Sequence, residues 1–241
     1  MKKIVFCLPI VTRPFQITID SLKASLPLIE AAGYEHALAQ IVDNPYISAA
    51  RATMLRAALD AKADIIMFID YDMGWRPQDL LTVIQTEGDC VAGTYRAKID
   101  DEQYMGKVEH DPVSFVPKVR ESDGAISANL IPAGFMKLTV EAVDTYMFRH
   151  PEHCYGPMYH LSVDLFNHGV HDRLWWGEDY SFSRRYKEKC GPIWIVPDLD
   201  LDHHAKDGKV YKGNYRRFLL RQPGGSESET PRNDRVTELR L

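Results

Sequence analysis

Residues 64–75 read Asp-Ile-Ile-Met-Phe-Ile-Asp-Tyr-Asp-Met-Gly-Trp, a short apolar run that ends in two aspartates separated by one residue. A run of this length is typical of a parallel strand that is covered on both faces. Such a strand delivers Asp70 and Asp72 to the carboxyl edge of a sheet, where α/β proteins bind ligands. Two carboxylates there can hold a divalent cation, and the cation can hold a diphosphate. On this stretch alone a second interpretation stays open, in which both aspartates only cap a turn and the following helix.

Strand and helix patterns alternate over the first hundred residues. The patterns predict strands at 3–11, 36–42, 65–69 and 89–93, and helices at 17–32, 46–61 and 77–85. This order indicates right-handed crossovers, so the predicted fold class is α/β, with a Rossmann-like, mostly parallel sheet flanked by helices. Neither GxGxxG nor GxxxxGK[ST] occurs in the chain. A cation on the aspartate pair is therefore the simplest means of holding a diphosphate.

Length and composition set the outer limits. The 241 residues are 45% hydrophobic, enough to bury one large core. The apolar stretches fall short of the roughly 18 residues that a membrane span needs, and Met1-Lys2-Lys3 leads into a strand without a cleavage site, which predicts a soluble, cytoplasmic protein without a membrane segment. The four cysteines show no CxxC spacing, which favours reduced thiols. Residues 222–241 have the composition of a loose tail.

The net charge of -5 argues against a surface that is generally suited to nucleic acid, but the charge is unevenly distributed. Residues 203–221 hold one acid and the following basic residues: Lys206, Lys209, Lys212, Arg216, Arg217 and Arg221. This basic stretch is either a site of phosphate contact or an ordinary solvated surface, and the sequence leaves both interpretations open.

Six motifs occur in a fixed order along the chain. They are Asn44 to Arg51, Asp70-Tyr71-Asp72, Val91 to Lys98, Pro132-Ala133-Gly134-Phe135-Met136, Gly177-Glu178-Asp179-Tyr180-Ser181-Phe182, and Asp200-Leu201-Asp202-His203 with Tyr211-Lys212-Gly213. Together they resemble the GT-A glycosyltransferases, particularly the small family-2-like enzymes of bacteria and phages, over about residues 3–220. The resemblance implies a GT-A fold with a smaller acceptor-side sheet. It also implies a single catalytic domain at 1–221, with a nucleotide-sugar-binding half at 1–98 and an acceptor-side half at 99–221.

The resemblance implies a metal-dependent transfer from a nucleotide-diphosphate sugar such as a UDP-sugar. Asp70-Tyr71-Asp72 is similar to the family's DxD motif, and His203 is similar to the histidine that completes the metal shell, with His204 as the substitute. Two carboxylates and an imidazole suit Mn²⁺ somewhat better than Mg²⁺. Besides these groups, the resemblance assigns three residues to donor binding: Asn44, Arg51 and Lys98.

An inverting transfer also needs a carboxylate that accepts the proton of the attacking hydroxyl. Gly177 to Phe182 is similar to the family's xED motif, whose last acid is usually that base, so Asp179 is preferred over Glu178. Acids in the first turn of a helix also interact favourably with the helix dipole, and this structural interpretation stays open.

The sequence indicates the acceptor substrate less clearly than it indicates the donor. The resemblance places Gly134 and Phe135 on the acceptor side, and Trp175 and Trp176 are either core residues or a stacking surface. The basic stretch, with Arg216 and Arg217, would suit a DNA backbone, so hydroxymethylated pyrimidine in phage DNA is the leading predicted acceptor. The alternatives are a bacterial surface-polysaccharide glycosyltransferase and a non-catalytic nucleotide- or metal-binding module. The sequence leaves the sugar and the oligomeric state open.

Overall fold

The computed structural model describes residues 1–10 and 13–221. The predicted tail at 222–241 lies outside the described residues, as does Val11, the predicted end of the first strand. Within the described part, no helix combines the length and the apolar character that crossing a bilayer requires. All four cysteines are free thiols.

The helices are α1 (Gln16–Ala31), α2 (Ile47–Asp60), α3 (Pro77–Gln85), α4 (Val140–Arg149), α5 (Glu178–Lys189) and α6 (Tyr215–Arg221), with a short 3-10 helix, η1 (Pro151–His153). The large sheet contains β1 (Lys2–Ile10), β2 (Tyr34–Val42), β3 (Ile65–Ile69), β5 (Cys90–Gly93), β6 (Lys107–Val108), β7 (Ile126–Leu130), β8 (Phe135–Thr139) and β13 (Ile193–Val196). A three-stranded sheet contains β4 (Met73–Trp75), β14 (Leu201–His204) and β15 (Val210–Gly213). Two hairpins pair β9 (Cys154–Tyr155) with β10 (Ser162–Val163) and β11 (Gly169–His171) with β12 (Leu174–Trp176).

The strand order of the large sheet is β2-β1-β3-β8-β5-β13-β7-β6. β1 pairs in parallel with β2 and β3, and β13 pairs in parallel with β5. β8 and β7 run against the other strands of this sheet. The expected fold class is confirmed: the protein is α/β, with a large, mostly co-directional sheet flanked by helices and accompanied by smaller sheets.

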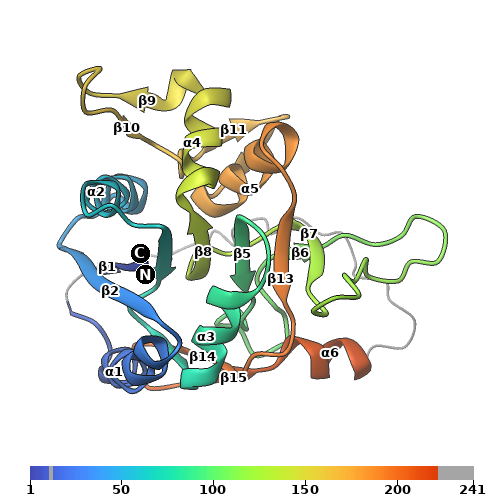
Figure 1. The fold of residues 1–241 in the computed structure, drawn as a ribbon. Helices are drawn as coiled ribbons and strands as arrows, with labels where there is room; N and C mark the ends of the chain where they lie inside the picture. Colours follow the sequence, from blue (N-terminus) through green and yellow to red (C-terminus); the bar gives the residue numbers. More distant parts are fainter. Residues whose placement is uncertain (11–12, 222–241) are drawn as a thin grey trace, which may run out of the picture.

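β3 is buried on both faces because its apolar residues alternate between two cores. Ile66 and Phe68 pack with residues of α2, α4 and α5. Ile65, Met67 and Ile69 pack with residues of α1 and α3 on the other face. Figure 1 shows the same division, with α1 and α3 on one side of the sheet and α2, α4 and α5 on the other. The central strand therefore holds the residue that follows it, Asp70, in a rigid position.

The run 193–202 is divided between two sheets. β13 ends at Val196, and Pro197, which has no N–H to donate to a ladder, follows it. The chain then enters β14, which pairs with β4 and β15 instead of the large sheet. This division matters for the site because the pairing of β14 with β4 brings the backbone N–H of His204 to the carbonyl of Asp72, at 2.9 Å.

The predicted division into halves at residue 98 stays a prediction. The first core contains Cys7 and Met54 together with Phe182 and Ile193, so it is built from both predicted halves.

Candidate functional site

Asp70 lies at the end of β3, next to the turn that precedes β8. Its backbone N–H donates to the carbonyl of Gly134 at 2.9 Å. A Cβ atom at Gly134 would lie 2.5 Å from Oδ2 of Asp70 and would also collide with the hydroxyl of Tyr95. The glycine at this position therefore allows the Asp70 carboxylate and the Tyr95 ring to approach the backbone closely.

Arg51 joins this carboxylate to the acidic pair at the start of α5. Its guanidinium donates to Asp70 Oδ1 at 2.8 Å and to Glu178 Oε1 at 2.6 Å. The Arg51 side chain is only 3% exposed, and it lies 5.2 Å from the ring centroid of Phe166. Burial acts to lower the pKa of Arg51, but the charges of Asp70, Glu178 and Asp179 outweigh burial and raise it. Arg51 is therefore a permanent cation that links β3 to α5.

Asp179 lies in the first turn of α5, beside Glu178. Its Oδ1 atom accepts from the backbone N–H of Tyr180 at 2.8 Å. Burial and the neighbouring Glu178 raise the pKa of Asp179 to about 7, while Arg51 acts in the opposite direction. A carboxyl group with such a pKa can accept a proton from a hydroxyl near neutral pH, which is the property of a general base.

Asp72 meets two side chains from other parts of the chain. Lys98 forms an ion pair with Oδ2 of Asp72, and Nε2 of His203 lies 3.7 Å from Oδ1. Nδ1 of His203 lies 2.8 Å from the carbonyl oxygen of Arg96, and because a carbonyl only accepts, Nδ1 carries the proton. The Tyr95 ring packs edge-on against the imidazole at 4.9 Å.

His203 therefore presents the lone pair of Nε2 toward Asp72. Burial lowers the pKa of His203, more than the Asp72 charge raises it, so the imidazole is held in its neutral form. His204 lies elsewhere: its Nε2 would lie 3.3 Å from a Cβ at Gly74, and its ring lies 6.1 Å from Phe15. The structure thus brings the side chain of His203, and not that of His204, to the carboxylate of Asp72.

The predicted ligand set of Asp70, Asp72 and His203 is not assembled as one group. Among residues 1–10 and 13–221, these three side chains do not bring one ligand atom each within 4.8 Å of one another. The reason is the turn after β3: the N–H of Met73 bonds the carbonyl of Asp70 at 3.3 Å, so the aspartates do not share one face as they would on a continuing strand. Asp70 faces Arg51, and Asp72 faces His203.

Asp72 and His203 nevertheless fit a divalent cation as two protein ligands. One is a carboxylate, and the other is a neutral imidazole whose second nitrogen is fixed by the Arg96 carbonyl, the arrangement that orients metal-binding histidines. The surroundings also carry more acids than paired cations: among residues 1–10 and 13–221, Asp70, Asp72 and Glu178 form ion pairs with Arg51 and Lys98, and Asp179 lies beside Glu178. A divalent cation would offset that excess.

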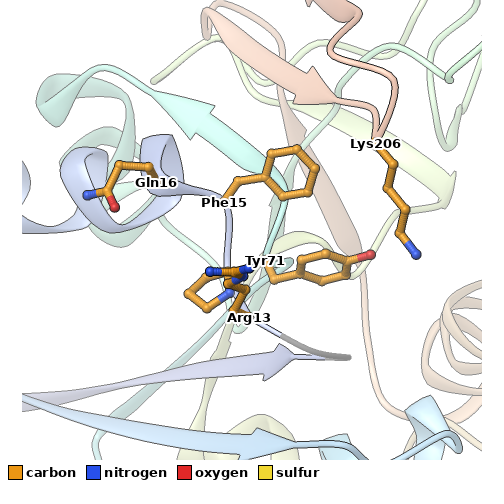
Figure 2. A pocket seen from close by; sticks show the side chains of 6 residues that line it. Arg13, Phe15, Gln16, Tyr71 and Lys206 are labelled. Atoms are coloured by element: carbon orange, nitrogen blue, oxygen red, sulfur yellow. The ribbon is translucent and has the colours of Figure 1, made fainter.

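Two neighbouring cavities share Tyr71. The smaller, about 170 Å³, is lined by Asn44, Arg51, Asp70, Asp72 and Glu178, with apolar residues from the end of β1 and the start of α2. Figure 2 shows the larger, about 500 Å³, where the rings of Phe15 and Tyr71 lie near each other with the Lys206 side chain beside them. Arg13, Pro14 and Gln16 complete its lining. One cavity is therefore rich in carboxylates, and the other offers aromatic rings and cations.

Several predicted acceptor residues have side-chain contacts with residues outside this group. Phe135 is fully buried and packs 5.4 Å from Trp75, so its side chain belongs to the core. Trp175 is 67% exposed on β12. Trp176 lies under the guanidinium of Arg184 at 4.6 Å and donates to the carbonyl of His171.

Much of the basic stretch is already paired with acids of the chain. Lys209 pairs with Asp100, Lys212 lies 3.9 Å from Asp202, and Arg221 pairs with Glu102. Arg216 and Arg217 are exposed on α6, and Lys206 lines the larger cavity.

Sequence reasoning gave no individual role to Tyr95 or to the Arg96 carbonyl, although both fall within the motif Val91 to Lys98. Tyr95 is 3% exposed and lies between Gly134 and His203. The available signal was an aromatic residue just beyond Thr94, which follows β5, at the same sheet edge as Asp70.

No family model and no curated protein matches the chain. Among solved structures, A197 from STIV is similar at 16% identity and a TM-score of 0.48, over 89% of this chain and 95% of that one. A mutant of Drosophila β-1,4-galactosyltransferase 7, in complex with manganese, UDP-Gal and xylobiose, is similar at 11% identity and a TM-score of 0.42, over 95% of this chain and 76% of that one. S. aureus TarS in complex with UDP-GlcNAc is similar at 13% identity and a TM-score of 0.41, over 81% of this chain and 56% of that one.

Proposed function

We propose that the protein is a metal-dependent, inverting glycosyltransferase that uses a nucleotide-diphosphate sugar. The proposal rests on one observation: two groups of side chains with different chemical properties lie in and beside the smaller cavity. Asp72 and His203 form a two-ligand cation site, and Asp179, beside Glu178, has a pKa raised to about 7. Arg51 connects the two groups through Asp70 and Glu178.

Each of the two groups meets one chemical requirement of glycosyl transfer. The bond between the anomeric carbon and the phosphate oxygen breaks, so negative charge builds on the departing diphosphate, and the Lewis-acid stabilisation of that charge is the chemistry that a bound divalent cation supplies. Lys98, next to Asp72, is placed to donate to the same phosphates. Asp179 accepts the proton of the attacking hydroxyl, and the new bond forms on the opposite face of the sugar.

The two cavities give the donor a defined orientation. The diphosphate lies at Asp72, near Tyr71, where the cavities adjoin. The sugar enters the smaller cavity, toward Glu178, and the nucleoside lies against Phe15 and Tyr71 in the larger one. The aromatic rings suit the base of the nucleoside, and the cations Arg13 and Lys206 suit a phosphate.

For the acceptor, the proposal is hydroxymethylated pyrimidine in DNA, and it rests on the exposed Arg216 and Arg217 of α6 and on Lys206. The internal ion pairs of Lys209, Lys212 and Arg221 leave fewer cations for a phosphate backbone than the sequence implies. The charge reversal of Arg216 and Arg217 to glutamate should raise KM for DNA and reduce the salt slope of DNA binding by roughly one unit per lost contact. Lys23→Glu, an exposed change on α1, is the matched control.

The experiment combines purified protein, Mn²⁺ and a set of nucleotide sugars with hydroxymethylated DNA or with saccharide and lipid-linked acceptors. Mass spectrometry detects the product, and release of nucleoside diphosphate reports turnover. We expect transfer that depends on Mn²⁺ and is lost in Asp179→Asn. Transfer only to saccharide or lipid-linked acceptors would replace the DNA acceptor with a surface polysaccharide. A folded protein that releases no nucleoside diphosphate with any acceptor would be a non-catalytic binding module.

A further inference from the structure

A second group of metal-binding side chain types lies away from the cavities, where α4 ends and η1 begins. His150, Glu152 and His153 bring one ligand atom each within 4.8 Å of one another. Nδ1 of His150 lies 3.1 Å from Oε1 of Glu152, and the two imidazole rings stack with centroids 5.4 Å apart. An ion with bonds of about 2.0 to 2.2 Å places neighbouring ligand atoms roughly 3 to 3.5 Å apart, so the group has a suitable size.

The contacts of His150 leave a lone pair without a donor. The residue is 3% exposed, and its Nε2 lies 3.4 Å from the carbonyl oxygen of Arg185 on α5. Both partners of the ring, the Arg185 carbonyl and the Glu152 carboxylate, only accept, whereas a neutral imidazole carries a single proton. One ring nitrogen therefore directs a lone pair at an oxygen. With the proton on Nε2, a cation between Nδ1 and the Glu152 carboxylate satisfies both without adding a proton to a buried ring.

The surroundings supply contacts of the kind that support a metal ligand. The hydroxyl of Tyr146 lies 2.8 Å from Nδ1 of His153 and can orient that ring. Burial and the nearby Arg185 lower the pKa of His153, which keeps it neutral, as a ligand must be. Asp164, whose charge acts on His153, has a buried oxygen, Oδ1, without a hydrogen-bond partner among the described residues. This carboxylate offsets the positive charge of Arg185.

We propose that His150, Glu152 and His153 form a second site for a divalent cation of the zinc class, separate from Asp72 and His203. Two imidazoles and one carboxylate are ligands that Zn²⁺ accepts, with a remaining position for water because the Glu152 side chain is 57% exposed. The bound cation connects η1 to α5 through His150 and Arg185. It therefore stabilises the segment that leads from α4 to the two hairpins, and it takes no part in proton transfer.

The test uses the full chain, stripped of metal with a chelator, in the His203→Ala background that removes the first site. Zn²⁺ affinity is measured by competition with a chromophoric chelator, and Co²⁺ absorption reports the coordination geometry. We expect one tight Zn²⁺ per chain, a rise in Tm on Zn²⁺ addition, and a loss of affinity of at least tenfold in both Glu152→Gln and His153→Ala. His160→Ala, an exposed histidine elsewhere, is the control and should bind as the background does.

Glu152 lies on the surface, so Glu152→Gln should fold normally, which circular dichroism checks. Zn²⁺ affinity that is unchanged by both Glu152→Gln and His153→Ala would overturn the proposal. The absence of any Zn²⁺ binding tighter than about 100 μM would overturn it as well, because such affinity is no better than that of scattered surface histidines.

Discussion

Lys98 and His203 approach the same carboxylate from two sides: the Lys98 ammonium pairs with Oδ2 of Asp72, and Nε2 of His203 lies 3.7 Å from Oδ1. The carboxylate that should bind a divalent cation is therefore already paired with a cation of the chain. A divalent cation between Oδ1 and Nε2 of His203 would be repelled by the nearby Lys98 ammonium. If the proposed function holds, the Lys98 ammonium turns to the donor phosphates, and we expect Lys98 to couple the binding of the cation to the binding of the diphosphate.

Substitution of Lys98 should separate these two contributions. In Lys98→Met the competing cation is gone, so the affinity for Mn²⁺ without nucleotide should rise severalfold, while kcat should fall because the phosphates lose a donor. Calorimetric titration with Mn²⁺ and a steady-state assay measure both. Lys209→Met, which removes a lysine from an exposed pair with Asp100, should change neither. Weaker Mn²⁺ binding in Lys98→Met would mean that Lys98 supports the cation site instead of competing with it.

Arg51 should be essential both for stability and for the geometry of the site. Arg51→Met leaves Asp70 and Glu178 without their shared partner in a poorly solvated place, and removing one partner of a buried pair costs about 3 to 5 kcal/mol. Arg51→Lys keeps the charge but cannot donate to both carboxylates in the same geometry, so it should lose activity with a smaller loss of stability. Urea unfolding and kcat distinguish the two. If Arg51→Met unfolds at the wild-type urea concentration, the bridge contributes no stability.

The pH dependence should report the ionisation of Asp179. Its pKa is raised to about 7, so the carboxyl is protonated below that pH and cannot accept a proton. Activity should therefore rise with pH through about 7 and level off above it. Asp179→Asn should lower kcat by about 10² or more and remove this rise, with the fold and the donor affinity preserved. Glu178→Gln is the comparison: if it loses the pH-dependent step and Asp179→Asn keeps it, Glu178 is the base.

The sequence predicted the local elements well because they depend on local patterns. The apolar run at 65–69 matches β3, and the proline at residue 77 indicated where α3 begins. The antiparallel position of β8 between β3 and β5 was not predictable, because pairing with a distant strand leaves no local signal. The division of 193–202 between two sheets depends on the partner β4, which is only three residues long.

The predicted site residues stay predictions, and the sequence did not indicate which of them contact one another. Asp70 and Asp72 were expected to act together, and the turn between them directs one to Arg51 and the other to His203. Arg51 was expected to contact the donor, yet its partner Glu178 lies 127 residues away in the chain. Such pairings follow from the tertiary fold, which brings α2, β3 and α5 together, and no spacing in the sequence encodes them.

The binding of UDP as a function of Mn²⁺ tests the proposed donor site most directly. Calorimetric titration of the wild-type protein should show UDP binding that requires Mn²⁺, and Asp72→Ala should lose this requirement together with most of the affinity, because it removes the carboxylate at the cation site. Asp179→Asn should bind UDP as the wild type does. UDP affinity that depends on Mn²⁺ to the same degree in Asp72→Ala and in the wild type would contradict the proposed site.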